Sequence, residues 1–274
     1  MNVVVGALVV IAVTSVAIAA MLVVRRRAPD GSYFSDGDRA SGVFGVLATG
    51  FSILLGFVVF LAFSTYDTSR AGADAEALTV FQQVETAQFF PRTAGAALTG
   101  ELVCYGRSVV NAEWDRMRAG TQGDDLNPWG VALFRTLRTV TPQTDTQQSA
   151  YDKWLDQTST REEARRDRVH GAVGVIPTQL WIVLFFISAV IFVYMLFFAD
   201  RGERAVTQAM LMGGVASVIT VMLLLLGSLD QPFHPGVGGL RPVAMERSLR
   251  VLDDVVPSLA PGVSPPCDTV GRPL

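Results

Sequence analysis

The chain is poor in charged residues. Only 17% of its 274 residues are Asp, Glu, Lys or Arg, and half are hydrophobic, whereas a soluble domain usually carries about a quarter charged residues. The net charge is only -3 and no block of Lys or Arg stands beside aromatic residues, so we expect no nucleic-acid partner. The deficit of charge indicates a membrane protein.

Histidine is almost absent as well. His170 and His234 are the only two, so a paired-histidine metal motif cannot be built, and neither lies in a Ser/His/Asp signature. No glycine-rich phosphate loop follows a strand. Glu76, Glu85, Glu101 and Glu113 leave paired-carboxylate catalysis open, but nothing in their spacing favours it over salt bridges on solvated faces. We expect no enzyme, catalytic residue, metal ion or cofactor.

Four apolar runs contain no Asp, Glu, Lys, Arg or His. They cover residues 2–24, 43–64, 173–198 and 209–229, and each has the roughly 20 residues that a helix needs to cross a bilayer. Inside lipid the backbone must satisfy its own hydrogen bonds, so each run should be helical. We therefore predict an all-α polytopic membrane protein with four transmembrane helices, embedded in a lipid bilayer.

The first run could instead be a cleavable signal, because Ala17-Ile18-Ala19 resembles a cleavage site. However, no basic residue precedes it and Arg25–Arg27 follow it directly, which is the reverse of the charge pattern of a signal peptide.

The short loops 25–42 and 200–208 carry Arg and should face the cytoplasm. Both termini and residues 65–172 then lie outside. Labelling of single cysteines placed near Gln122 and Ser35 tests this orientation.

One cluster argues for the opposite orientation. Four arginines precede the third run, but interleaved acidic residues make them resemble a solvated helix face; they are Arg161, Arg165, Arg166 and Arg168.

The predicted organisation is two transmembrane helices in 1–64, an inserted extracytoplasmic helical domain in 65–172, and two transmembrane helices in 173–229. These are followed by a post-membrane segment with a short amphipathic helix in 230–256 and a disordered Pro/Gly/Ser-rich tail in 257–274.

The inserted domain should be a bundle of amphipathic helices. Apolar residues recur at spacings of three and four from Leu98 to Ala112. Asn127-Pro128 is a good helix start, and a last helix should run from about Thr146 through Arg168.

The chain has only two cysteines, Cys104 and Cys267. Two predicted spans separate them in the sequence, so both should lie on the same side of the membrane. Outside the cytoplasm they could form a disulfide; alternatively, Cys104 is a packed thiol.

Four short motifs lie in order around these spans: Ala75-Glu76-Ala77, Tyr105 through Glu113-Trp114, Pro177 through Trp181, and Leu229-Asp230-Gln231-Pro232-Phe233. With them the chain resembles the bacterial family called bestrophin-like, from the first span to about Leu252. The resemblance implies a distant likeness to bestrophins, oligomeric anion channels with four spans per subunit. Bestrophins keep their large inter-span region in the cytoplasm, whereas the Arg distribution here predicts that it lies outside.

The candidate site lies at one face of the membrane, where six residues are expected at a similar depth: Tyr66, Asp67, Arg70, Gln179, Trp181 and Asp230. Asp230 follows an apolar run at the C-terminal end of a helix, where the helix dipole disfavours an anion. It should therefore have a partner, and Arg70 is the cation expected nearest to the same depth in the membrane. The pair could fasten the second and fourth spans; alternatively, Asp230 joins a carboxylate ring at an oligomer's mouth, favouring cations. In the first case Asp230→Ala should destabilise the protein more than Asp268→Ala in the tail.

Small and hydroxylated residues recur along two spans: Gly45, Thr49, Ser52 and Gly56 in the second, and Gly213, Ser217 and Thr220 in the fourth. They can let helices touch or line a water path, which would need an oligomer. The function expected is an oligomeric channel-like or transport protein, as a homo-oligomer. The alternative is a non-conducting scaffold or envelope sensor whose outer helices bind a partner that the sequence does not identify.

Overall fold

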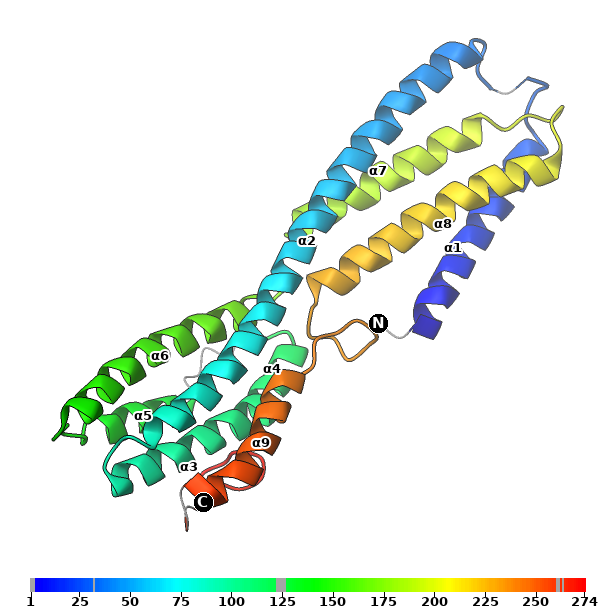
Figure 1. Cartoon of the computed structure of the whole chain (residues 1–274). Helices are drawn as coiled ribbons and strands as arrows, with labels where there is room; N and C mark the ends of the chain where they lie inside the picture. Colours follow the sequence, from blue (N-terminus) through cyan, green and yellow to red (C-terminus); the bar gives the residue numbers. More distant parts are fainter. Residues whose placement is uncertain (1–2, 32, 122–126, 260–261, 263) are drawn as a thin grey trace. The chain divides into compact units, whose positions relative to one another are not determined.

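The computed structural model describes residues 3–31, 33–121, 127–259, 262 and 264–274. Its helices are α1 (Val3–Arg25), α2 (Gly37–Ala87), α3 (Arg92–Ser108), the π-helical segment η1 (Val109–Glu113), α4 (Trp114–Arg118), α5 (Pro128–Leu137), α6 (Asp145–His170), α7 (Thr178–Phe197), α8 (Ala205–Asp230) and α9 (Val243–Leu259). Within the described residues, β pairing is limited to an isolated bridge between Cys267 and Pro273. The all-α prediction is confirmed (Figure 1).

Four of these helices, α1, α2, α7 and α8, are long and apolar enough to cross a membrane. The predicted number of spans is confirmed. Helix α2 is much longer than a bilayer requires, with 51 residues, because no proline or glycine pair interrupts its second half before Pro91. Its apolar first half resembles a span and its second half carries the polar residues of a water-facing helix.

The chain divides into two compact units. Unit 1 comprises residues 1–64, 174–230 and 235–238, and unit 2 comprises 65–173, 231–234 and 239–274. Helix α2 therefore contributes its first part to unit 1 and its second part to unit 2. The predicted post-membrane segment and tail belong largely to unit 2.

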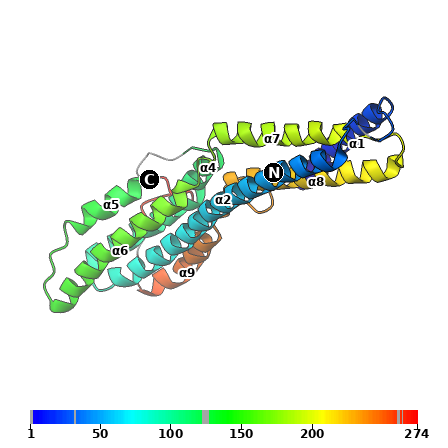
Figure 2. The ribbon, with the colours of Figure 1, turned by 90° about the horizontal axis from the view of Figure 1, so that it is seen from above.

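Unit 1 is built from the membrane-spanning parts of four helices. Helix α1 packs along α8, and the two lie side by side in Figures 1 and 2. Gly213 makes this approach close, because a Cβ on it would meet the Ile18 side chain at 3.0 Å. A second cluster joins α2, α7 and α8 through buried aliphatic residues, including Leu55, Leu184 and Leu226. Gly213 thus acts in helix packing, one of its two predicted roles.

Unit 2 is a helical bundle around an apolar core to which α3, α5, α6, α9 and the second part of α2 contribute. The N-cap of α5 is as predicted, since the Asn127 side chain accepts a hydrogen bond from the Trp129 backbone N–H at 3.0 Å. Gly106 lets α9 approach α3, because a Cβ there would lie 3.0 Å from Leu249 Cδ2. Of the apolar residues that predicted the helix from Leu98 to Ala112, those up to Val109 are buried in this core, whereas Ala112 is exposed.

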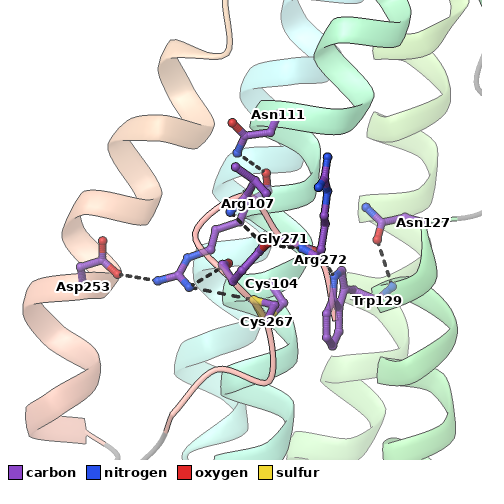
Figure 3. The surroundings of a disulfide bond; sticks show 11 residues. Cys104, Arg107, Asn111, Asn127, Trp129, Asp253, Cys267, Gly271 and Arg272 are labelled. Atoms are coloured by element: carbon purple, nitrogen blue, oxygen red, sulfur yellow. Dashed lines mark hydrogen bonds and ion pairs between the residues drawn. A yellow bond between two sulfur atoms is a disulfide. The ribbon is translucent and has the colours of Figure 1, made fainter. Parts of the chain in front are cut away.

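The prediction of a disordered tail is wrong for residues 264–274. Cys267 is 5% exposed and forms a disulfide with Cys104 of α3, with the two Cα atoms 5.8 Å apart. Trp129 Nε1 donates to the Gly271 carbonyl at 2.7 Å, and Arg107 donates to the Asp268 carbonyl at 3.3 Å (Figure 3). The disulfide and these hydrogen bonds hold a segment whose composition alone indicates disorder.

Gly271 shows how closely this segment lies against α3. Its φ of +83° is in the left-handed region, and a Cβ would meet the Ser108 backbone nitrogen at 2.4 Å. Only glycine fits both constraints. Residues 257–259 of the predicted tail belong to α9 instead, and residues 260, 261 and 263 lie outside the described residues.

Candidate functional site

Asp230 is a connected carboxylate at the end of α8. Its Oδ1 accepts hydrogen bonds from the backbone N–H groups of Val175 and Ile176, at 2.8 and 2.9 Å, and its Oδ2 accepts from Trp181 Nε1 at 3.3 Å. The residue is 8% exposed. Because all three donors precede or begin α7, the carboxylate ties the C-terminal end of α8 to the N-terminal end of α7 within unit 1.

The sequence explains why these donors are available. The N–H groups of Val175 and Ile176 precede α7 and its N-cap Pro177, so no intrahelical carbonyl accepts from them. Gly174 allows the approach, since a Cβ on it would lie 3.0 Å from Asp230 Oδ2. The N–H groups before α7 thus compensate an anion placed at the unfavourable end of α8.

The expected ion pair between Asp230 and Arg70 is not among the contacts of the described residues. Arg70 belongs to unit 2, where it lines a pocket of about 460 Å³ together with Asp74, Arg241 and Arg247. Three donors already satisfy Asp230 without a cation. The charge pattern suggested a side-chain partner, whereas two of the actual partners are backbone groups, which no side-chain pattern identifies.

The other predicted site residues divide between the two units. Tyr66 is half-buried against the core of unit 2, and Asp67 is exposed on α2. Gln179 is exposed on α7, and Trp181 stacks on Phe185 with ring centroids 5.7 Å apart. Among the described members of the predicted set, the structure joins Trp181 to Asp230.

The opposite ends of the unit 1 helices are held together by their loops. Arg25, at the end of α1, donates to the carbonyl groups of Arg201 and Glu203, and Arg201 donates to the carbonyl of Arg26. The N–H groups of Gly31 and Gly202 donate to Asp200 and hold its pKa below the usual range. The two Arg-bearing loops therefore meet at one end of unit 1.

Unit 2 contains a buried ionic network that the sequence analysis interpreted as solvated. Arg168, which is 0% exposed, bonds both oxygens of Glu76 and donates to Glu113 Oε2 at 2.6 Å. Tyr105 donates to Glu76 Oε1 at 2.6 Å, and Asn127 Nδ2 donates to Glu113 Oε1 at 2.8 Å. The network joins α2, α3, η1 and α6.

Charge compensation sets the protonation states in this network. Burial alone would lower the pKa of Arg168, but Glu76 and Glu113 outweigh it and raise that pKa. Burial alone would raise the pKa of Glu113, but Arg168 and Arg165 hold it below its ordinary value. Burial raises the pKa of Tyr105, with Glu76 adding to the shift. Arg168 and Glu113 are thus held charged and the phenol of Tyr105 neutral, as suits a network that holds helices together.

A sequence signal for this network exists on α6. Its buried positions are Ala150, Trp154, Gln157, Arg161, Ala164 and Arg168, a regular alternation of four and three residues. That spacing marks one helical face. Two arginines on the same face as Trp154 therefore indicate buried cations, although the acidic neighbours in the chain suggest solvation.

The family model of the bestrophin-like domain matches residues 9–244. The chain belongs to the bestrophin-like family. The predicted resemblance is confirmed, and with the four apolar helices it makes this bestrophin-like chain a membrane protein. No curated protein sequence matches the chain.

Solved structures extend the likeness to the whole fold. A bacterial bestrophin homolog from Klebsiella pneumoniae, solved as single-substitution variants, is similar with TM-scores of 0.64 and 0.65 at 13% and 14% identity. The first comparison covers 89% of the bestrophin-like chain and 98% of the homolog, and the second 93% and 98%. A structure described as a membrane protein gives 0.64 at 14% identity, covering 92% and 98%. At these identities the likeness concerns the fold.

Within the described residues, no group of three or more His, Cys, Asp or Glu side chains could hold a metal ion. The carboxylates of the network in unit 2 are bonded to arginine, tyrosine and asparagine. These bonds hold the helices of unit 2 together.

Proposed function

We propose that this bestrophin-like chain is a subunit of an oligomeric ion channel or transport protein of the bacterial cell membrane. The observation that carries the proposal is that the fold likeness to a bacterial bestrophin homolog spans nearly all of both chains. A subunit that shares the complete arrangement of spans and inserted bundle can share an assembly mode. Four helices per chain rarely enclose a water path, so the proposal requires a homo-oligomer.

The outer face of α2 supports a role in the oligomer. Gly45 and Gly56 are exposed, and a Cβ on either would meet no atom within 4 Å. Ser52 and Gly56 line a groove of about 530 Å³ that continues over Gly214 and Val218 of α8. Packing between neighbouring subunits and a path for ions are both served by such small side chains.

Selectivity in such a channel would come from pore width, hydroxyl groups and charges at the mouths. The apolar runs of the four spans contain no Asp, Glu, Lys, Arg or His, which argues against a proton-coupled transporter. We infer that Asp230 fastens helices instead of forming a carboxylate ring, and its low exposure and three hydrogen bonds support this.

We further propose that both termini and unit 2 lie outside the cytoplasm. The Arg-bearing loops that meet at one end of unit 1 favour a cytoplasmic location for that end. The disulfide between Cys104 and Cys267 favours an oxidising compartment for unit 2. Bestrophins hold the corresponding region in the cytoplasm, so this orientation would set the bestrophin-like chain apart from them.

The alternative is a non-conducting envelope sensor or scaffold. A pocket in unit 2 with buried arginine, described below, favours a sensor. The two functions differ in what they require of the spans, because a sensor needs no continuous polar path.

Reconstitution in liposomes tests the proposal. Purified protein should give a homo-oligomer by mass measurement and carry chloride or potassium ions across the vesicle membrane. Gly56→Leu should change the flux because it adds a side chain to the small-residue face of α2, whereas Phe57→Leu, at the exposed neighbouring position, should leave it unchanged. A monomer without flux of either ion would contradict the channel and leave the sensor.

A further inference from the structure

Unit 2 contains a pocket between α5 and α6 that the proposed function does not use. This α5–α6 pocket has a volume of about 370 Å³, within the range of small-molecule sites. Its polar lining consists of Asn127, Thr158, Arg161, Glu162 and Arg165. All of these residues belong to unit 2.

Arg161 gives the pocket a buried cation. Its side chain is 2% exposed, and its guanidinium lies over the Tyr105 ring at 4.9 Å from the centroid. Nη1 donates to Gln83 Oε1 at 2.8 Å, but Nε has no hydrogen-bond partner among the residues that the structure describes. A buried donor without a partner is costly, and it leaves the guanidinium with hydrogen-bonding capacity that Gln83 and Glu162 do not use.

Glu162 is the only carboxylate in the described lining, and it is weakly engaged. Its Oε1 lies 3.3 Å from Arg161 Nη2, and its side chain is 42% exposed. Because the carboxylate is on the exposed side of this pair, water can solvate it when it leaves Arg161. Glu113 compensates Arg165 and Arg168 from inside the network. A ligand carboxylate can therefore replace Glu162 at Arg161 at small cost.

The remainder of the lining is apolar. It includes Leu133, Phe134 and Leu137 of α5 and Trp154 and Leu155 of α6. Phe134 is 60% exposed and Leu155 45% exposed, so the rim is apolar as well. The pocket thus presents a cationic group and an apolar wall to the same ligand.

We propose that the α5–α6 pocket binds a small organic anion composed of a carboxylate and an apolar body. The carboxylate accepts hydrogen bonds from Arg161, and the apolar body lies against Trp154 and the α5 leucines. A fatty acid and a soluble aryl-alkyl acid share this chemistry. The site is independent of ion conduction, so its test involves no flux.

Calorimetry on the full-length protein in detergent tests the proposal with 4-phenylbutyrate as the probe. We expect one site with a Kd below about 1 mM and, for the neutral 4-phenylbutyramide, binding weaker by about tenfold or more, since a hydrogen bond to a charged group is lost. Octanoate represents a lipid-derived acid, and its tighter binding would identify an acyl chain as the natural body. Equal binding of the acid and the amide would overturn the proposal.

Two matched pairs of variants place the site. Glu162→Gln should tighten 4-phenylbutyrate binding about two- to fivefold because it removes the competing carboxylate, whereas Glu163→Gln, exposed and outside the lining, should not. Gly130→Leu should weaken binding at least about tenfold, because Gly130 lines the pocket and a Cβ added there would meet no atom within 4 Å, so the new side chain can fill the pocket. Ala97→Leu, exposed on α3, is the control.

These variants avoid the buried ions, so the protein should fold in each case, which its thermal unfolding verifies. Unchanged binding in Gly130→Leu, or equal behaviour of the Glu162 and Glu163 variants, would overturn the proposal. If the unchanged protein binds no acid and Gly130→Leu reduces the mass of the oligomer, the pocket is instead a contact between subunits.

Discussion

The two units handle charge in opposite ways. In unit 1 the apolar runs carry no Asp, Glu, Lys, Arg or His, and Asp230, at the end of α8, is satisfied by N–H groups. In unit 2, Glu76, Glu113, Arg161 and Arg168 are all buried within the bundle. A charge in hydrocarbon has neither water nor a partner, whereas a bundle in water can afford buried ions if each is bonded. The comparison indicates that the surroundings of each unit decide whether its interior can hold charges: unit 1 excludes them, and unit 2 holds them as bonded ions.

The buried network should also favour one arrangement of helices in unit 2. Arg168 contacts carboxylates from α2 and η1 together, so a shifted α6 would leave unpaired ions. Unit 1 depends on close packing at positions such as Gly213. The predictions below separate these two kinds of stability, from the largest expected effect to the smallest.

The largest loss is expected for Arg168→Met. It leaves Glu76 and Glu113 buried without their common cation, which should cost about 3–5 kcal/mol of unfolding free energy. Arg166→Met, at an exposed position of the same helix, is the control. Thermal unfolding in detergent, with hydrogen exchange measured separately in α6 and α8, should show the loss in unit 2. Equal, small losses for both variants would mean that the network is not what holds the bundle.

Breaking the disulfide should produce the next largest effect. Reduction, or Cys267→Ser, should cost about 2–4 kcal/mol and raise hydrogen exchange in residues 264–274 and α3, while α7 and α8 stay protected. Non-reducing mass spectrometry of the native protein should find Cys104 linked to Cys267. Two thiols that alkylate without reduction would contradict the bond.

Asp230→Ala should cost about 1–3 kcal/mol, since it leaves the N–H groups of Val175 and Ile176 without their acceptor. Asp268 is not a suitable control, because its carboxylate accepts from the N–H groups of Val270 and Arg272. Asp67→Ala, at an exposed position on α2, serves instead. If thermal unfolding gives the same result for both, Asp230 does not fasten α8 to α7.

The smallest effect is expected at Glu101. Burial raises the pKa of this carboxyl, although the Thr136 hydroxyl donates to it. A raised pKa in the folded state adds stability below the unfolded value of about 4.3, which is lost as the pH rises through the folded pKa. Glu101→Gln should therefore raise the melting temperature slightly at pH 7 and not at pH 4. A decrease at pH 7 would show that the charged form is favoured.

Much of the fold could be predicted from the sequence because its signals are local. Charge-free runs identified the spans, and Asn127-Pro128 identified the start of α5. The network was missed because Glu162, Glu163 and Asp167 make α6 look solvated, while burial depends on which face meets α2. The ordered tail was missed because composition cannot show that Cys267 and Cys104 come within 5.8 Å. The donors to Asp230 were missed because two of them are backbone groups.

The central proposal is that unit 1 lies in the membrane and that unit 2 lies in an oxidising compartment outside the cytoplasm. Gln122 lies outside the described residues, so a labelling site is better placed at Ser159, which is exposed on α6. Ser159→Cys and Ser35→Cys, each treated with an impermeant maleimide in intact cells, test the claim most directly. The account predicts labelling at position 159 and protection at position 35 until the membrane is permeabilised. Labelling at position 35 with protection at position 159 would contradict it.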